Sequence, residues 1–117
     1  MGISRNDTNE RASKSVIHNG VAYLSGQVPA DADAGIQDQT QSTLDRIDTI
    51  LKDIGSSREN IISATVYLRD IDNHFALMNE IWNNWVPTGH APARACVEAH
   101  MARPALLVEI SMIAAIN

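Results

Sequence analysis

Two charged residues in the last third of the chain are placed where they could act on a small molecule. Arg94 follows Pro92 at the start of a β-rich run. Fifteen residues later, Glu109 interrupts an apolar stretch that runs from Leu107 to Ile110. An arginine presents a planar fork of donors that suits a carboxylate, and a glutamate can hold or activate a water. The pair therefore predicts a site for a small carboxylate.

Each of these residues also has a structural interpretation. Arg94 could be a surface arginine paired with a carboxylate. A glutamate is rarely buried without a partner, so Glu109 could pair with a neighbour, including Arg94 itself. Cys96 could be a nucleophile, but His100 is the only histidine near it in the same predicted strand. Since buried cysteines usually behave as small hydrophobes, covalent catalysis by Cys96 is not expected.

Other residues with chemical potential are assigned to packing. The chain has four histidines, His18, His74, His90 and His100, and their spacing does not match a set of metal ligands. No metal is therefore expected. Trp82 and Trp85 are predicted to pack in the core or between subunits and not to stack on bases.

Length and composition restrict the class of protein. A chain of 117 residues is long enough for one domain, which we expect to span residues 1–117. Its hydrophobic fraction of 44% and charged fraction of 20% are ordinary for a soluble globular protein. Only five residues are Phe, Trp or Tyr, so the core must be mostly aliphatic. Because a core of this size is modest, oligomerisation would add useful buried area.

The charge pattern and the ends of the chain argue against several partners. The net charge is −5 and the nine Lys and Arg residues are scattered, which argues against nucleic acid. A single cysteine fits a reducing compartment. The N-terminus has no apolar signal-like region, and no apolar run reaches the length of a membrane span. We therefore expect a cytoplasmic domain that does not bind membranes.

The first half of the chain predicts a hairpin and a helix. Residues 1–13 are polar and unpatterned and are expected to form a flexible N-terminal arm. Two β-rich runs, 16–18 and 21–25, flank Asn19-Gly20, a strong signal for a tight hairpin turn. From Ile36 to Ile54 the apolar residues follow a helical period, and Gly55 then favours a stop.

The second half predicts three strands and one more helix. Residues 61–68 and 94–100 are expected to be strands, and 106–116 a strand so apolar that both of its faces should be covered. A helix from about Asp72 is closed by Pro87 and Gly89. Its apolar face would carry Phe75, Met78, Ile81, Trp82 and Trp85. The order β-β-α-β-α-β-β favours an α+β fold, with two helices on one face of a mixed sheet.

Five short segments, taken together, resemble a known family. They are Ser25–Pro29, Gln39-Thr40, Ala64–Leu68, Ala91–Arg94 and Val108–Ile110. Their sequences, order and spacing are similar to those of the Rid family, also called the YjgF/YER057c/UK114 or RutC-like family. The resemblance runs from about residue 14 to the C-terminus, and residues 79–94 are similar to the short YoaB-like bacterial members.

The resemblance implies a fold and an activity. The fold would be chorismate-mutase-like and assembled as a homotrimer, with active sites in clefts between subunits. Members that keep the arginine hydrolyse reactive 2-imino acids or enamines, such as 2-iminopropanoate and 2-iminobutanoate, to 2-keto acids and ammonia. These imines are released by pyridoxal-phosphate-dependent dehydratases, and the hydrolysis itself needs no cofactor.

The resemblance also implies roles for residues of this chain. Arg94 would bind the substrate carboxylate and Glu109 would orient the attacking water. Cys96 would lie beside the substrate and contribute main-chain contacts. Gly26 and Ser25 would line the cleft, and Asn79 would border it.

The chain departs from the family at its N-terminal arm. The best-studied branch carries there an aromatic ring that closes over the substrate, whereas residues 10–15 contain none, and Ala12 stands where YoaB-like members often have Trp. This departure keeps open a second function, a ligand-binding or regulatory trimer that senses a keto acid. A holdase-like chaperone is a further possibility. The ribonuclease activity ascribed to some relatives is disfavoured by the acidic charge.

Overall fold

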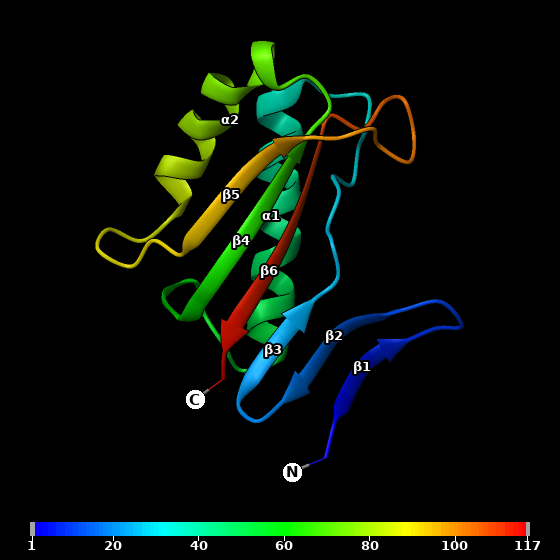
Figure 1. The fold of residues 1–117 in the computed structure, drawn as a ribbon, viewed down its shortest axis with the longest axis vertical. Helices are drawn as coiled ribbons and strands as arrows, with labels where there is room; N and C mark the ends of the chain where they lie inside the picture. The colour runs from blue at the N-terminus through cyan, green and yellow to red at the C-terminus, as the bar shows by residue number, and fades with distance from the viewer. Residues whose placement is uncertain (1, 117) are drawn as a thin grey trace.

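A six-stranded mixed sheet forms the body of the protein. The computed structural model describes residues 2–116, and its strands are ordered β1-β2-β3-β6-β4-β5 (Figure 1). Only the β4–β5 pair is parallel, and the other neighbours run antiparallel. The strands are β1 (Ser4–Thr8), β2 (Ser13–His18), β3 (Val21–Leu24), β4 (Ile61–Leu68), β5 (Ala93–Glu98) and β6 (Val108–Ala115).

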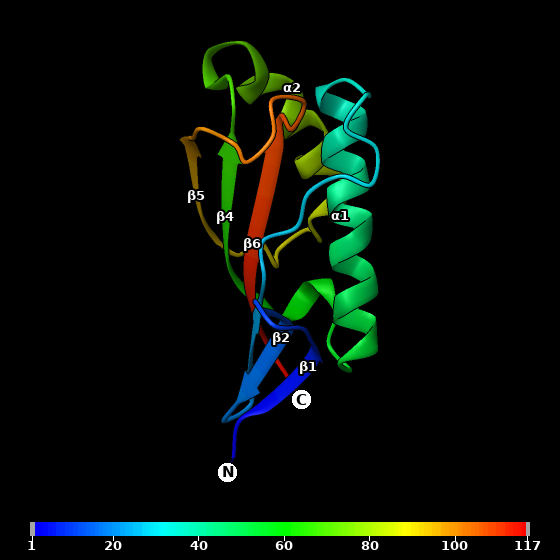
Figure 2. The same ribbon diagram turned by 90° about the vertical axis from the view of Figure 1, so that its right-hand side faces the viewer.

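Both α-helices cover the same face of this sheet. Figure 2 shows α1 (Ile36–Asp53) and α2 (Ile71–Trp85) on one side of β4, β5 and β6. A short 3-10 turn, Arg58–Asn60, leads into β4. The predicted two-layer α+β architecture is therefore confirmed. Neither helix has the length and apolar character that crossing a bilayer requires.

The alternation of side chains along the central strands produces the core. In β6 the residues Val108, Ile110 and Met112 are buried under the helices, and the residues between them are half-exposed. From α1, Leu44, Ile47 and Leu51 pack against this surface. The helical periodicity of residues 36–54 placed these residues on one face, and the structure confirms that helix to within one residue at its end.

The predicted arm is wrong in the structure, because Ser4–Thr8 form β1. This strand pairs antiparallel with β2, with Arg5 opposite Val16 and Thr8 opposite Ser13. Its residues are almost all polar and exposed, so the sheet holds it through backbone hydrogen bonds and not through a buried face. A polar edge strand leaves no alternating pattern in the sequence. Met1 lies outside the described residues.

The predicted hairpin is confirmed, whereas one predicted packing residue is wrong. Asn19 and Gly20, with φ of 51° and 75°, turn the chain between β2 and β3 as the Asn-Gly signal indicates. On α2, Met78, Trp82 and Trp85 are buried, but Phe75 is 43% exposed. Phe75 is the fifth residue of α2, one turn before the buried Met78.

Candidate functional site

Arg94 is held against α2 by three side chains. It is the second residue of β5 and lies opposite Ala64 of β4, which is buried under the helices. Its Nη1 donates to the Asn79 Oδ1 at 2.9 Å and lies 3.9 Å from the Met78 sulfur. Its guanidinium carbon lies over the Trp82 ring, 5.0 Å from the centroid. The charged head is thus positioned without a carboxylate.

No ion pair neutralises Arg94 within residues 2–116. The two ion pairs of this part of the chain join Lys14 to Asp7 and Arg58 to Asp48. A guanidinium has five N–H donors, and only Nη1 of Arg94 has hydrogen-bonding partners here. The arginine therefore keeps donors with which it can bind an anion. Within residues 2–116, Arg94 is therefore not a surface arginine paired with a carboxylate.

Cys96 lies two residues beyond Arg94 on the same face of β5. It is half-buried, lies opposite Val66 and packs against the core. Burial raises the pKa of its thiol, and the nearby charge of Arg94 only partly offsets that effect. Since the thiolate is the nucleophilic form, this environment favours an unreactive thiol.

Glu109 lies on the other face of the sheet. It sits between the buried residues Val108 and Ile110 on β6 and is half-exposed. Its neighbour in register on β4 is Tyr67, whose side chain also points away from the helices. Within one chain, Glu109 therefore does not pair with Arg94, because the two side chains leave the sheet in opposite directions.

Gly26 allows the Glu109 carboxylate to lie against the backbone. A Cβ placed on Gly26 would collide with the Glu109 Oε2. Gly26 lies between Ser25 and Gln27, and Gln27 forms two backbone hydrogen bonds with Ile110, at 2.8 and 3.0 Å. The absence of a side chain at this position therefore decides where the carboxylate can lie.

Ser25 and the turn between β1 and β2 surround a small cavity beside Gly26. Ser25 Oγ donates to the Ser13 carbonyl, and Ser25 N donates to the Lys14 carbonyl. The cavity of about 200 Å³ is lined by Asp7, Asn9, Ala12, Ser13, Lys14, Ser25 and Gln27. Ala12 and Ser13, which belong to the stretch 10–15 that contains no aromatic residue, thus border this cavity.

Gln39 fixes the approach to β6. Its side chain is fully buried, and its Oε1 accepts a hydrogen bond from Leu107 N at 2.9 Å. Its Nε2 donates to the carbonyl oxygens of Ala105, Ala32 and Ala34. One buried amide therefore ties the loop before α1 to the loop before β6. This anchors β6 two residues ahead of Glu109.

The site residues thus form two groups that one chain does not bring together. The first consists of Arg94, Asn79 and Cys96, on the helix side of β5. The second consists of Glu109, Gly26 and Ser25, around the start of β6. Each group contacts its own neighbours, and the sheet separates the two groups.

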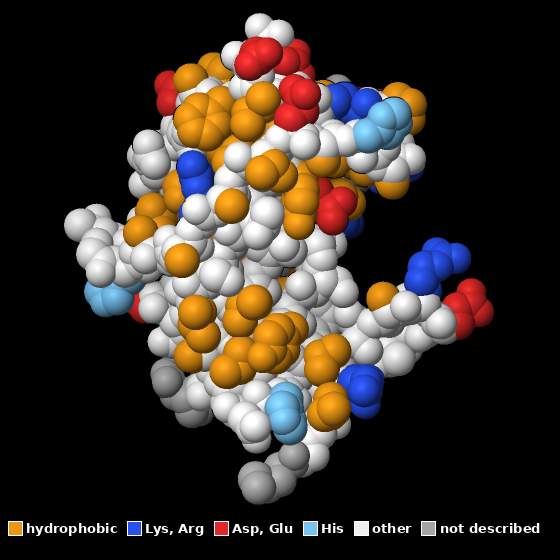
Figure 3. All heavy atoms as spheres, in the orientation of Figure 1, with side chains coloured by type: hydrophobic (Ala, Val, Ile, Leu, Met, Phe, Trp, Pro, Cys, Tyr) orange, Lys and Arg blue, Asp and Glu red, His pale blue; other side chains and the backbone are white. Residues whose placement is uncertain are grey.

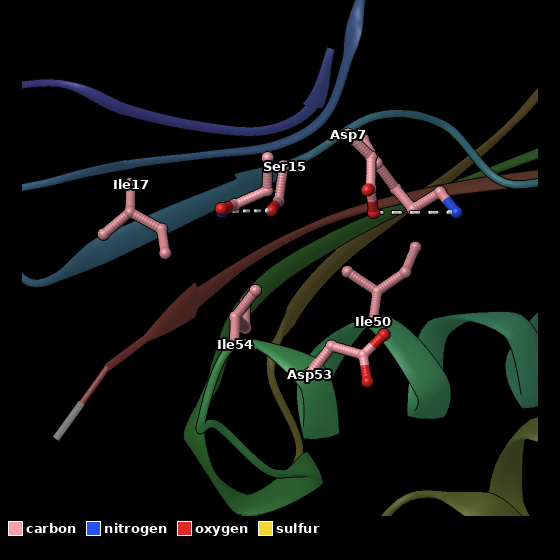
Figure 4. A pocket seen from close by; sticks show the side chains of 8 residues that line it. Asp7, Ser15, Ile17, Ile50, Asp53 and Ile54 are labelled. Carbon is pink, nitrogen blue, oxygen red and sulfur yellow. Dashed lines mark hydrogen bonds and ion pairs between the residues drawn. The ribbon is translucent and has the colours of Figure 1, made fainter.

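A larger cavity lies elsewhere and contains none of these residues. It measures about 290 Å³ and lies between the pair β1 and β2 and the C-terminal half of α1 (Figure 4). Its apolar residues are Ile17, Ile50 and Ile54, and Asp53 lies at its edge. Separately, no three His, Cys, Asp or Glu side chains of residues 2–116 gather in a way that could hold a metal ion.

Sheet topology and helix placement define this chain as a small two-layer α+β protein, with two helices on one face of a mixed sheet. A family model described as Endoribonuclease L-PSP matches residues 3–116. The chain is 44% identical over 116 residues to the RutC family protein YoaB of Escherichia coli K12, covering 99% of this chain and 100% of the relative. The chain belongs to the Rid (YjgF/YER057c/UK114, RutC-like) family.

Solved structures support the same assignment. NMB1025 from Neisseria meningitidis, a member of the YjgF protein family, is 41% identical and has a TM-score of 0.95, covering 100% of this chain and 97% of that protein. YyfA from Yersinia pestis, of the Rid protein family, is 28% identical with a TM-score of 0.89, covering 98% and 100%. The resemblance identified from short segments is thereby confirmed along the whole chain.

Proposed function

We propose that this protein is a hydrolytic deaminase. It would convert reactive 2-imino acids or enamines, such as 2-iminopropanoate and 2-iminobutanoate, to 2-keto acids and ammonia. The observation that carries the proposal is the state of Arg94, which is held in place against α2 yet has no carboxylate partner within residues 2–116. A positioned arginine with unused donors suits a small carboxylate.

The proposed reaction needs placement more than activation. The carbon of a C=N bond is already electrophilic, so fixing the substrate and one water supplies much of the effect. Arg94 binds the carboxylate, and Glu109 holds the water and accepts its proton as the oxygen attacks the imine carbon. The C–N bond of the resulting carbinolamine then breaks. Both protons of the water end on nitrogen: Glu109 returns the proton that it accepted, and the carbinolamine hydroxyl gives up the second as the keto group forms. Nitrogen then leaves as ammonia, without a cofactor or metal.

A complete site would need a second copy of the chain. Arg94 and Glu109 lie on opposite faces, so Arg94 of one subunit would meet Glu109 of a neighbouring one. The sheet face opposite the helices can carry such contacts, since Tyr23 and Ile62 are each 48% exposed there and Val97 is 43% exposed. Figure 3 shows hydrophobic side chains gathered over the lower part of this face. We propose a homotrimer with clefts between subunits, acting in the cytoplasm.

The experiment is a coupled imine assay. An amino-acid oxidase generates the 2-imino acid, and semicarbazide traps the imine that survives. Wild-type protein is expected to reduce the trapped imine, and Arg94→Ala to lose that effect. Arg46→Ala is a suitable control, because Arg46 is a surface arginine of α1 that donates only to the Val28 carbonyl. Full activity of Arg94→Ala would overturn the proposed role of Arg94.

A ligand-binding function is the second candidate. The cavity beside Ser25 is bordered by Ala12 and Ser13, and none of the described residues that line it is aromatic. In that case the cleft would bind a 2-keto acid without hydrolysing the imine. Binding of pyruvate by wild type, with no acceleration for several imino acids, would favour this function over the deaminase.

A further inference from the structure

Two tryptophans on α2 each lie against an arginine, and the two arginines differ in one respect. Trp82 and Trp85 are one turn apart, with ring centroids separated by 5.9 Å, and both are almost fully buried. The guanidinium carbon of Arg58 lies 4.7 Å from the Trp85 centroid, and that of Arg94 lies 5.0 Å from the Trp82 centroid. The contact between Arg58 and Trp85 can therefore be compared with the contact between Arg94 and Trp82.

The contact between Arg58 and Trp85 belongs to a closed network. Arg58 donates from Nε and Nη2 to the two carboxylate oxygens of Asp48, at 2.8 and 2.7 Å. Its Nη1 donates to the Trp85 carbonyl, and the Trp85 Nε1 donates to Asp48. Every nitrogen of this guanidinium has a partner, so the contact serves the stability of the fold.

The contact between Arg94 and Trp82 is not part of a network in which every guanidinium nitrogen has a partner. Of the three guanidinium nitrogens of Arg94, only Nη1 has partners within residues 2–116. Asn79 and Trp82 lie three residues apart on α2 and hold one end and one face of the guanidinium. A long arginine side chain normally loses considerable rotamer entropy when it binds a ligand. Holding it beforehand reduces that loss and leaves Nε and Nη2 available.

We propose that Trp82 is a positioning residue for Arg94, which fixes the guanidinium in the orientation that binds the substrate carboxylate. The inference rests on the proposed function, because it assumes that Arg94 binds a carboxylate. The face of the Trp82 indole attracts the guanidinium of Arg94 and leaves the N–H donors of that guanidinium free. Trp82 should therefore affect substrate affinity, seen as KM and as the dissociation constant of the keto acid, more than kcat. The effect on kcat should be small because the attacking water is held by Glu109, which lies on another strand.

The test replaces the indole without changing its shape. Mono-, di- and trifluorotryptophan are introduced at position 82, since fluorine withdraws electron density from the ring and weakens attraction to a cation. The same series at Trp85 is the matched control. Pyruvate binding is measured by titration, and imine hydrolysis gives KM and kcat. Trp82→Phe and Trp82→Leu extend the series.

The expected result is a stepwise rise in the dissociation constant and in KM at position 82, reaching roughly 3- to 10-fold, with kcat nearly unchanged. Fluorination at Trp85 should leave pyruvate binding unchanged. Trp82→Phe should retain more affinity than Trp82→Leu. If wild type binds pyruvate through Arg94 but the series at position 82 has no effect, the role of Trp82 is overturned and the proposed function stands. If wild type neither binds nor hydrolyses, both are overturned.

Discussion

Arg94 and Glu109 leave the same sheet through opposite faces, with β4 between their two strands. Arg94 lies in register with the buried Ala64, and Glu109 with Tyr67, three positions further along β4. Neighbours in register point to the same side and successive residues alternate. An odd separation along β4 therefore places the two charged side chains on different faces. This relationship is the reason for proposing that two subunits share each site.

Mixed oligomers test that sharing directly. Arg94→Ala and Glu109→Ala should each retain only a small residual activity when assembled alone. When equal amounts are dissociated and reassembled together, about one site in four should combine an intact Arg94 with an intact Glu109, because each required subunit is present with a probability of about one half. The measurement is imine hydrolysis, with the mixing confirmed by native mass spectrometry. No recovery in verified mixed oligomers would contradict a shared site.

Gly26→Ala should impair the reaction through the position of Glu109. The new methyl group would collide with the Glu109 carboxylate, which must then move. We expect kcat to fall about tenfold or more, because a misplaced water-binding group is costly in catalysis. In the background of Glu109→Ala, the same glycine substitution should have little further effect. Independent, additive losses in this double-mutant cycle would show that Gly26 acts by another route.

Cys96→Ser should leave hydrolysis within about twofold of wild type. Burial raises the pKa of the thiol above its ordinary value, so little thiolate is present near neutral pH. A backbone contact to substrate would survive the substitution. The comparison uses kcat and KM near neutral pH, together with thermal unfolding to detect a packing defect. A loss of several hundredfold in a folded variant would instead indicate covalent chemistry at the sulfur.

Local chemistry predicted much of this structure from sequence alone. The Asn19-Gly20 turn and the helical period after Ile36 each depend on near neighbours, and both were found where expected. The polar strand Ser4–Thr8 was missed because it is stabilised by backbone pairing with β2, which leaves no side-chain pattern. We expected both faces of β6 to be covered. In the single chain the helices cover one face, and the residues on the other face are half-exposed.

The site was harder to predict than the elements that carry it. The types of Arg94 and Glu109 indicated their chemistry, but the faces they occupy depend on the register of β5 and β6 on β4. That register joins segments far apart in the chain, so local periodicity does not reveal it. Trp82 was expected to pack, which it does, yet only the three-dimensional structure places its ring against Arg94.

Asp48→Ala should weaken the fold without weakening the site. Asp48 accepts hydrogen bonds from Arg58 and from the Nε1 of Trp85. Its removal leaves the donor of a buried indole without a partner, for which we expect a loss of about 1–3 kcal/mol in the free energy of unfolding. The partly exposed ion pair to Arg58 adds little. Urea denaturation measures the change, and pyruvate affinity of the folded variant should match wild type.

Asp70 should make the stability of the protein depend on acid pH. It caps α2 by accepting hydrogen bonds from the Asn73 N and Nδ2, and the side-chain bond from Asn73 is the main cause that holds its pKa below the ordinary value. A group whose pKa is lower in the folded state stabilises the fold above its unfolded pKa, near 3.9, and loses that contribution as pH falls through the folded pKa.

Asp70→Asn keeps an acceptor but does not titrate. Thermal unfolding from pH 7 to pH 2 should show the stability of wild type decreasing relative to Asp70→Asn as the pH falls below about 4. A constant difference between the two proteins over this range would show that the cap does not favour the ionised carboxyl group.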